Sequence, residues 1–165
     1  MKKNYIIVAV SVLFLVFLDQ LTKQIIVRTM NLSESIEVIK GFFYITSHEN
    51  DGAAWGILEG QMIILIFITF IAFALFYFLL KEINFKEKLF YSVSVILLIS
   101  GAIGNFIDRV LAGYVVDFLD FIIFGYDFPT FNVADMALVI GVAIFAIDIL
   151  KEDLFHAKNK NRSSK

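Results

Sequence analysis

The chain has 165 residues, of which 59% are hydrophobic and only 18% are charged, and its mean hydropathy is +0.82. A soluble domain of this length has no core large enough to bury so many apolar side chains, so a soluble enzyme and a disordered chain are both excluded. The net charge of −2 gives no reason to expect a nucleic-acid partner, and the lack of Cys excludes disulfides, thiolate metal sites and a cysteine nucleophile.

Several segments are long and apolar enough to cross a membrane as helices, which takes about 20 residues each. The predicted spans are 5–27, 60–80, 89–108 and 133–150. The first resembles a signal peptide, but it ends in DQLTK rather than in the small residues of a cleavage site, so we predict an uncleaved span. Together with their loops, these spans predict a single membrane-embedded domain over 1–158.

The basic residues predict the orientation of the spans, because Lys and Arg gather in cytoplasmic loops. Ten of the fourteen lie before the first span, between the second and third, or after the fourth. The loops at the opposite ends of the spans are mainly acidic. We therefore predict that both termini and the polar tail 159–165 are cytoplasmic, and that segments 28–59 and 109–132 are external.

The two external segments differ in pattern. The first contains the alternating stretch IKGFFYITSHEN and then Gly52, which predicts short strands and a turn. In the second, an apolar stretch could pass for a fifth span, but Asp117 and Asp120 would each then cost about 2.5–3.5 kcal/mol in the bilayer. We predict an external loop at the membrane interface there. The predicted fold class is thus an α-helical membrane protein with four spans, a small external sheet and an interfacial loop.

Ionisable side chains in or beside membrane spans are costly, so they mark candidate functional sites. With a helical rise of 1.5 Å per residue, these side chains fall at one depth, near the external ends of the spans. The members of this group are Asp19, Lys23, Asn105, Asp108, Arg109, Asp117 and Asp135. A random scatter of polar residues would not produce such a layer.

Some members of this group also have a structural interpretation. Asp19 and Lys23 are four residues apart on one helix, so they can neutralise each other as an ion pair. Asn105, Asp108 and Arg109 share one helix face, where they can either close the third span with hydrogen bonds or hold a substrate carbonyl. Both interpretations remain open at this point.

The two remaining Asp residues differ in how well structure alone explains them. Asn132 and Asp135 fit the N-cap and the third position of the fourth helix, where a carboxylate is favoured by the helix dipole. Asp117 lies in the apolar stretch VVDFL, with no helix end or evident partner to explain it. That isolation favours a functional role for Asp117.

A pair of carboxylates is the hydrolytic arrangement that the sequence retains. The H-E-x-x-H and G-x-S-x-G motifs are absent, and His48 and His156 have no metal-ligand spacing, so we predict neither a metal nor another cofactor. Two adjacent Asp side chains share one proton, so that one activates water while the other donates to the scissile carbonyl. Asp117 and Asp135 are the candidates for this pair.

Two functions without catalysis compete with this hypothesis. The same carboxylates would suit a transporter that relays protons or cations. Such a path also needs polar groups in the cytoplasmic half, where the second and third spans carry little besides Ser92 and Ser94. A purely structural four-span scaffold would not need the layer of ionisable side chains at all.

Five motifs, taken in order, make the chain resemble the lipoprotein signal peptidase (signal peptidase II) family of bacteria. They are DQLTK at 19–23, NDGAAWG at 50–56, GAIGNFIDR at 101–109, VVDF at 115–118 and FNVAD at 131–135. The resemblance implies a membrane aspartyl endopeptidase in the bacterial plasma membrane, with its active site near the outer face. It would remove the signal peptide from diacylglyceryl-cysteine-modified prolipoproteins by cleaving before the lipidated cysteine.

The resemblance also implies a role for each matching residue. Asp117 and Asp135 would be the catalytic aspartates. The substrate-binding or supporting residues would be Asp19, Lys23, Asn50, Gly52, Trp55, Asn105, Asp108, Arg109 and Asn132. Trp55, where the family often has Phe, would be an apolar lid, and segment 31–58 would form a small β-cradle and a short helix resting on the bilayer. The expected partners are prolipoproteins and membrane lipids, and we expect a monomer.

Overall fold

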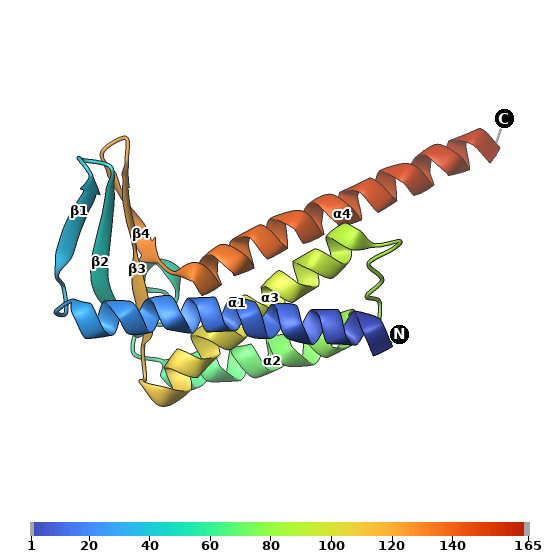
Figure 1. The fold of residues 1–165 in the computed structure, drawn as a ribbon. Coiled ribbons are helices and arrows are strands. Elements are labelled where there is room, and N and C mark those ends of the chain that lie inside the picture. The colour runs from blue at the N-terminus through green and yellow to red at the C-terminus, as the bar shows by residue number, and fades with distance from the viewer. Residues whose placement is uncertain (1, 164–165) are drawn as a thin grey trace.

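The computed structural model describes the backbone of residues 2–163, and the side chains of most of them (Figure 1). Its described helices longer than one turn are α1 (Lys2–Thr29), α2 (Met62–Leu80), α3 (Leu89–Leu111) and α4 (Val133–Ser163). Four helical segments within these are long and apolar enough to cross a membrane, which confirms the predicted multi-pass fold. Helix α4 continues into the predicted tail as far as Ser163, and 164–165 lie outside the described residues.

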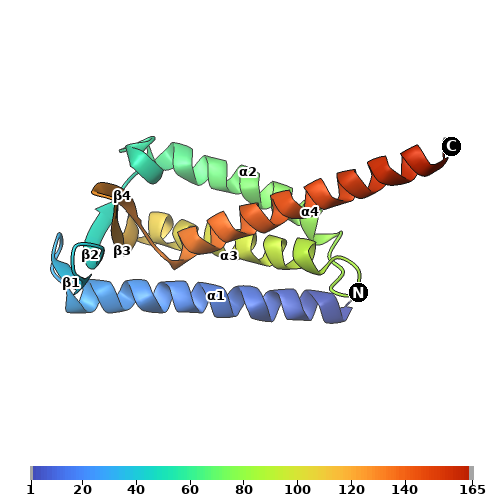
Figure 2. The ribbon, with the colours of Figure 1, turned by 90° about the horizontal axis from the view of Figure 1, so that it is seen from above.

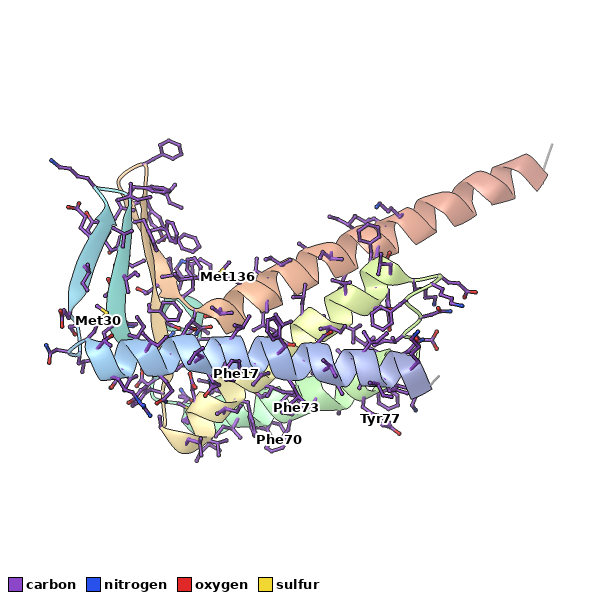
Figure 3. The ribbon with its side chains drawn as sticks, viewed as in Figure 1. Phe17, Met30, Phe70, Phe73, Tyr77 and Met136 are labelled. Atoms are coloured by element: carbon purple, nitrogen blue, oxygen red, sulfur yellow. The ribbon has the colours of Figure 1, made fainter. Side chains whose placement is uncertain are left out.

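Helix α3 is the centre of the bundle and contacts each of the other three helices (Figure 2). In its most apolar stretch, 61% of the residues are buried, against 11–17% in the other helices. The outer faces of those helices carry large apolar side chains such as Phe17, Phe70 and Tyr77, all more than half exposed (Figure 3). Side chains of this kind suit lipid rather than water, which explains the excess of apolar residues in the composition.

Glycines let α3 approach its neighbours closely at the height of the ionisable residues. A Cβ atom on Gly104 would lie 2.6 Å from Asp19 Oδ2 and 3.0 Å from Ala134 Cβ. A Cβ on Gly101 would overlap the backbone oxygen of Ala134 and lie 2.7 Å from Leu138 Cγ. Small residues at helix crossings allow such close packing in membranes. Here they bring polar side chains of α1, α3 and α4 within hydrogen-bond reach.

The two external segments combine into one antiparallel sheet. Its strands are β1 (Ser35–Ile39), β2 (Phe43–Asn50), β3 (Val115–Ile123) and β4 (Tyr126–Phe131), in that spatial order. The prediction of strands in segment 28–59 is therefore confirmed. The short helix that the resemblance implies there corresponds to a 3-10 turn, Ala54–Gly56.

The prediction of an interfacial loop around 110–126 is wrong, because this segment forms the β3–β4 hairpin. Its apolar stretch VVDFLDFII is rich in β-branched and aromatic residues, which favour a strand. Strand β3 pairs with β2, so its backbone groups are satisfied by a segment about 70 residues earlier in the chain. The hairpin turns at Phe124 and Gly125, both with positive φ, as two-residue hairpin loops require.

The sheet lies across one end of the bundle, where α1 ends and α4 begins (Figure 1). A small apolar cluster of Ile26, Val116 and Phe118 attaches it to the end of α1. The N-terminal end of α1 and the C-terminal end of α4 both lie at the opposite end of the bundle (Figure 1). The sheet and the polar ends of the spans are thus brought together at one end.

Candidate active site

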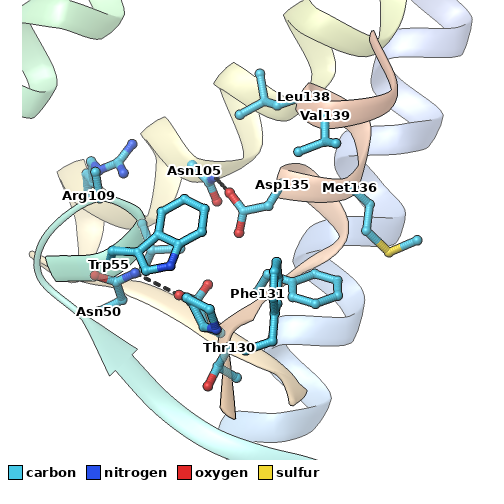
Figure 4. A pocket seen from close by; sticks show the side chains of 15 residues that line it. Asn50, Trp55, Asn105, Arg109, Thr130, Phe131, Asp135, Met136, Leu138 and Val139 are labelled. Carbon is cyan, nitrogen blue, oxygen red and sulfur yellow. Dashed lines mark hydrogen bonds between the residues drawn. The ribbon is translucent and has the colours of Figure 1, made fainter. Parts of the chain in front are cut away.

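Asp117 on β3 and Asp135 in the first turn of α4 both line a cavity of about 420 Å³ between the sheet and the bundle. Asp117 is only 1% exposed, and Asp135 is partly buried. Asn50, Asn105 and Arg109 border the same cavity, as Figure 4 shows. The rest of the wall is largely apolar and includes Phe128, Pro129, Phe131, Met136, Leu138 and Val139. The structure therefore brings the two predicted aspartates to one cavity, which is open on one side.

Asp117, which had no evident partner in the sequence, accepts hydrogen bonds from two side-chain amides. Asn50 Nδ2 donates to Oδ2 over 2.8 Å, and Asn132 Nδ2 donates to Oδ1 over 2.6 Å. Asn50 ends β2, whose neighbour in the sheet is β3, and Asn132 directly precedes α4. Neutral donors from two different elements thus hold this carboxyl group in place.

Asp135 is both a helix cap and a wall of the cavity. Its backbone N–H donates to Asn132 Oδ1 over 2.9 Å, and the N–H of Asn132 donates back to Asp135 Oδ2 over 3.2 Å. This is the reciprocal pattern of a capping box. The other oxygen, Oδ1, accepts from Asn105 Nδ2 over 2.7 Å. The capping interpretation is therefore correct, and it does not exclude a catalytic role.

Lys23 joins residues that are distant in sequence. Its Nζ lies 2.9 Å from Asp19 Oδ2, 2.9 Å from Asp108 Oδ2 and 2.9 Å from Asn105 Oδ1. The predicted ion pair with Asp19 is confirmed, but it is only part of a cluster that includes α3. Asp19 also accepts the N–H of Ala134 over 2.8 Å, so it holds the first turn of α4 against α1.

Gln20 belongs to this cluster, although the sequence analysis did not select it. Its Nε2 donates to Asp108 Oδ1 over 2.8 Å and to the backbone oxygen of Gly104 over 3.2 Å. An amide next to Asp19 inside an apolar span was the signal available in the sequence. Gln20 and Lys23 each contact a different oxygen of Asp108, which fixes that carboxylate between α1 and α3.

Arg109 does not join the Lys23 cluster but faces the loop that follows β2. Its guanidinium Nη2 lies 3.4 Å from the backbone oxygen of Gly52, and the N–H of Gly52 donates to Asn50 Oδ1 over 2.9 Å. Trp55, in the same loop, has a φ of 58° and a 65% exposed side chain, and its ring meets Phe128 edge-on. Figure 4 shows Trp55 in front of the cavity.

Comparison with known proteins agrees with this arrangement. The protein family described as Signal peptidase (SPase) II matches residues 11–151, which include every residue of the cavity wall. The chain belongs to the signal peptidase II family. Lipoprotein signal peptidases of Staphylococcus aureus strains MRSA252 and JH9 are 53% and 52% identical to it over 156 residues, which are 92% of this chain and 94% of each relative.

Two solved structures, each described as a bacterial membrane enzyme, have the same fold as this signal peptidase II family member. One superimposes with a TM-score of 0.80 at 52% identity and covers 88% of both chains. The other superimposes with a TM-score of 0.78 at 49% identity and covers 87% of this chain and 92% of its own. The agreement extends over both the helical bundle and the sheet, since neither alone accounts for such coverage.

Asp117 is a much weaker acid than an ordinary carboxyl group. Burial and, after it, the negative charge of Asp135 raise its pKa from 3.8 to about 7, although the hydrogen bonds from Asn50 and Asn132 partly oppose the shift. At neutral pH a carboxyl group with this pKa is protonated in about half of the molecules. Among the described residues, no three His, Asp or Glu side chains are arranged to hold a metal ion.

Proposed function

We propose that this chain is an aspartic endopeptidase that removes the signal peptide from diacylglyceryl-cysteine-modified prolipoproteins, cutting the bond before the lipidated cysteine. Membership of the signal peptidase II family and the names of the relatives support a peptidase that acts on lipoprotein precursors. The observation that carries the aspartic mechanism is that Asp117 and Asp135 line one cavity, each held by amide donors. No Cys is available as an alternative nucleophile.

The two carboxyl groups have distinct roles in this proposal. Asp135, ionised at the start of α4, takes a proton from water as the water oxygen attacks the scissile carbonyl carbon. Asp117, protonated near neutral pH, gives its proton to the carbonyl oxygen, and a gem-diol forms. The carbon–nitrogen bond then breaks as Asp135 passes its proton to the cysteine amine, and a gem-diol hydroxyl returns its proton to Asp117.

The other cavity residues are proposed to hold the substrate. Asn105 and Arg109 border the same space as the carboxyl groups and can bind the peptide backbone. Asn50 and Gly52 fix the loop that carries Trp55, which we propose covers the bound peptide as an apolar lid. The apolar wall suits the apolar end of a signal peptide, and acyl chains on the cysteine would remain in the adjacent lipid.

The decisive experiment is cleavage of a diacylglyceryl-modified prolipoprotein by the purified protein in detergent or vesicles. We expect two products, the free signal peptide and a mature chain whose first residue is the lipidated cysteine. The matched control is the same precursor without the lipid, which should be cut far more slowly. A transporter or a scaffold would cut neither, so the absence of both products would contradict the proposed function.

The pKa of Asp117 predicts the alkaline limit of the activity. Because Asp117 must donate a proton, kcat/KM is expected to fall about tenfold per pH unit once the pH rises above about 7. Below that pH the group stays protonated and this limit disappears. The measurement is kcat/KM between pH 6 and 9, with return to pH 6 as a control for irreversible loss. An activity that stays constant over this range would contradict the assignment of Asp117 as the proton donor.

We further propose that both termini are cytoplasmic and that the site lies near the outer face of the bacterial plasma membrane. The distribution of basic residues supports this orientation, as does the position of both helix ends opposite the sheet (Figure 1). A reporter fused after Lys165 should therefore be cytoplasmic, and one inserted beside Glu37 should be external. A reporter signal showing an external C-terminus would overturn the orientation.

We propose that residues 1–158 act as one peptidase domain and as a monomer, with 159–165 as a polar cytoplasmic tail. Each hydrogen bond that holds Asp117 and Asp135 comes from the same chain. Donors from this chain suffice to hold both carboxyl groups, which supports a monomer.

A further inference from the structure

Side-chain amides surround the two carboxyl groups, and each turns its NH2 end toward a carboxyl oxygen. Asn50 and Asn132 donate to Asp117, and Asn105 donates to Asp135. The two ends of a carboxamide have nearly the same size and shape, so sterics alone do not choose between them. If an amide were reversed, its oxygen would face a carboxyl oxygen, and the hydrogen bond would be replaced by repulsion. A hydrogen-bond donor to the amide oxygen would therefore favour the orientation in which the NH2 group faces the carboxyl group.

In each case an N–H donor holds the amide oxygen from the far side. Asn50 Oδ1 accepts the backbone N–H of Gly52 over 2.9 Å, and Asn132 Oδ1 accepts the backbone N–H of Asp135 over 2.9 Å. Asn105 Oδ1 instead accepts from the ammonium group of Lys23 over 2.9 Å. It also accepts from Asn132 Nδ2, over a longer 3.2 Å. Only for Asn105 is the principal orienting donor a charged side chain, which a substitution can remove.

The ammonium group of Lys23 is itself rigidly placed. It is almost fully buried, and its three N–H donors have three acceptors at 2.9 Å, on Asp19, Asp108 and Asn105. The two carboxylates are fixed in turn, Asp19 by the N–H of Ala134 and Asp108 by Gln20. The contact with Asn105 satisfies the third N–H donor of the buried ammonium group and at the same time fixes the position of the amide oxygen.

We propose that Lys23 is a positioning residue of the reaction, whose ammonium group orients the Asn105 amide so that its NH2 end holds Asp135 as an ionised base. This inference rests on the proposed function, because it assumes that Asp135 is the base. It assigns to Lys23 a task beyond the ion pair with Asp19. The effect is transmitted by two hydrogen bonds, from Lys23 on α1 to Asn105 on α3 and from Asn105 to Asp135 on α4.

The positive charge of Lys23 also changes the pKa of Asp117, and the direction of this change can be measured. The charge lowers the pKa of Asp117, so removing it raises that pKa further. The charged or titratable groups around the pair are Asp19 and Lys23 of α1, His48 of β2, Asp108 and Arg109 of α3, and each carboxyl group for the other. Lys23 contacts the amide that binds Asp135, whereas Arg109 contacts the loop at Gly52.

The test replaces Lys23 by Met, which keeps the length of the side chain but removes the donor and the charge. For Lys23→Met we expect kcat to fall about 10- to 100-fold with a smaller rise in KM, since the base is affected most and Asn105 is only one of the groups proposed to bind the substrate. Both limbs of the pH profile of kcat/KM should move up by about one unit. Lys40→Met, at an exposed hairpin position, is the matched control and should change neither quantity.

Two outcomes would overturn the inference. One is an unshifted pH profile with reduced kcat, which a purely structural role of Lys23 predicts. The other is strict additivity, in which Lys23→Met lowers the activity of Asn105→Ala as much as that of the unaltered enzyme. If Lys23 acts through Asn105, the double variant should be no worse than Asn105→Ala alone.

Two further variants keep the test decisive. Lys23→Met leaves Asp19 and Asp108 without their cation, so the protein must be compared at matched membrane abundance. If it does not accumulate, Lys23→Met combined with Asp108→Asn retains the net charge of the cluster and should show a smaller pH shift in the same direction, because the lost carboxylate partly offsets the lost ammonium group. Asp117→Asn is measured alongside. If Asp117→Asn keeps normal activity, the proposed function fails, whereas if it is inactive and the pH profile of the Lys23 variant is unshifted, only this inference fails.

Discussion

Replacing either Asp117 or Asp135 by Asn is expected to lower cleavage of lipid-modified precursor at least about 10³-fold, and the double variant should be scarcely worse. The reason is that, in the proposed mechanism, the two carboxyl groups share one proton and act as a unit. Without Asp135 no base takes the proton of water, and without Asp117 no acid protonates the carbonyl oxygen. Once one step is lost, the second substitution removes little more. The measurement is turnover by each variant at matched membrane abundance.

The structure supplies the control for this experiment. Asp120 lies on the same strand as Asp117 but accepts a hydrogen bond from Thr46 and does not border the cavity. Asp120→Asn should therefore cut precursor at a near-normal rate. Asn has almost the same shape as Asp, so the fold and membrane insertion should survive in all three single variants. Near-normal turnover by Asp117→Asn or Asp135→Asn would refute the assignment of the catalytic pair.

The sequence predicts the bundle well because the physics of a membrane span is local. A long apolar stretch must form a helix so that its backbone N–H and C=O groups are hydrogen-bonded in lipid. The basic residues between spans predict which ends of the helices are cytoplasmic. The cap formed by Asn132 and Asp135 is equally local, and its expected geometry is present. The unusual position of Asp117 in an apolar stretch favoured a functional role, which stays a prediction, and in the structure the residue borders the cavity.

Contacts between distant segments were beyond such reasoning. The stretch around Asp117 was predicted to be a loop because its partner strand, β2, lies about 70 residues earlier. The sequence shows Lys23 beside Asp19 but not its contacts with Asp108 and Asn105, more than 80 residues later. Gln20 was missed because its acceptors also lie on α3. The part that Asn50 plays at the site came only from the resemblance to a family.

The choice of amides around the pair has a physical explanation. A Lys or Arg bonded directly to Asp117 would stabilise its ionised form and lower its pKa, which would remove the acid near neutral pH. Asparagine carries no net charge, so it holds a carboxyl group in place with much less effect on its ionisation. The ammonium group of Lys23 contacts Asn105 rather than either of the two carboxyl groups proposed to be catalytic. The amides thus fix the positions of both carboxyl groups, and no cation is bonded directly to either of them to stabilise its ionised form.

The second large effect should come from a glycine that does not itself border the cavity. Gly101→Ala is expected to lower the free energy of unfolding by about 1–3 kcal/mol, although alanine normally favours a helix over glycine. The added Cβ would overlap the backbone oxygen of Ala134, and a backbone atom has no other rotamer to adopt. Helix α3 or the first turn of α4 must therefore shift. Asp135 is the next residue after Ala134, so the shift moves the proposed base.

Activity per folded molecule should consequently fall as well, by up to about 100-fold if Asp135 moves by about 1 Å from Asn105. The matched control is Gly141→Ala on the same pair of helices, where the three atoms nearest the new Cβ would belong to Leu97 and Leu98, at 3.0–3.2 Å. Contacts of this length are relieved by shifts of a few tenths of an ångström, and these leucines do not border the cavity, so Gly141→Ala should leave turnover per folded molecule unchanged. The measurements are thermal unfolding in detergent and cleavage normalised to folded protein. If Gly101→Ala lowered stability but left normalised turnover intact, the close crossing of α3 and α4 would serve the fold alone and would not position Asp135.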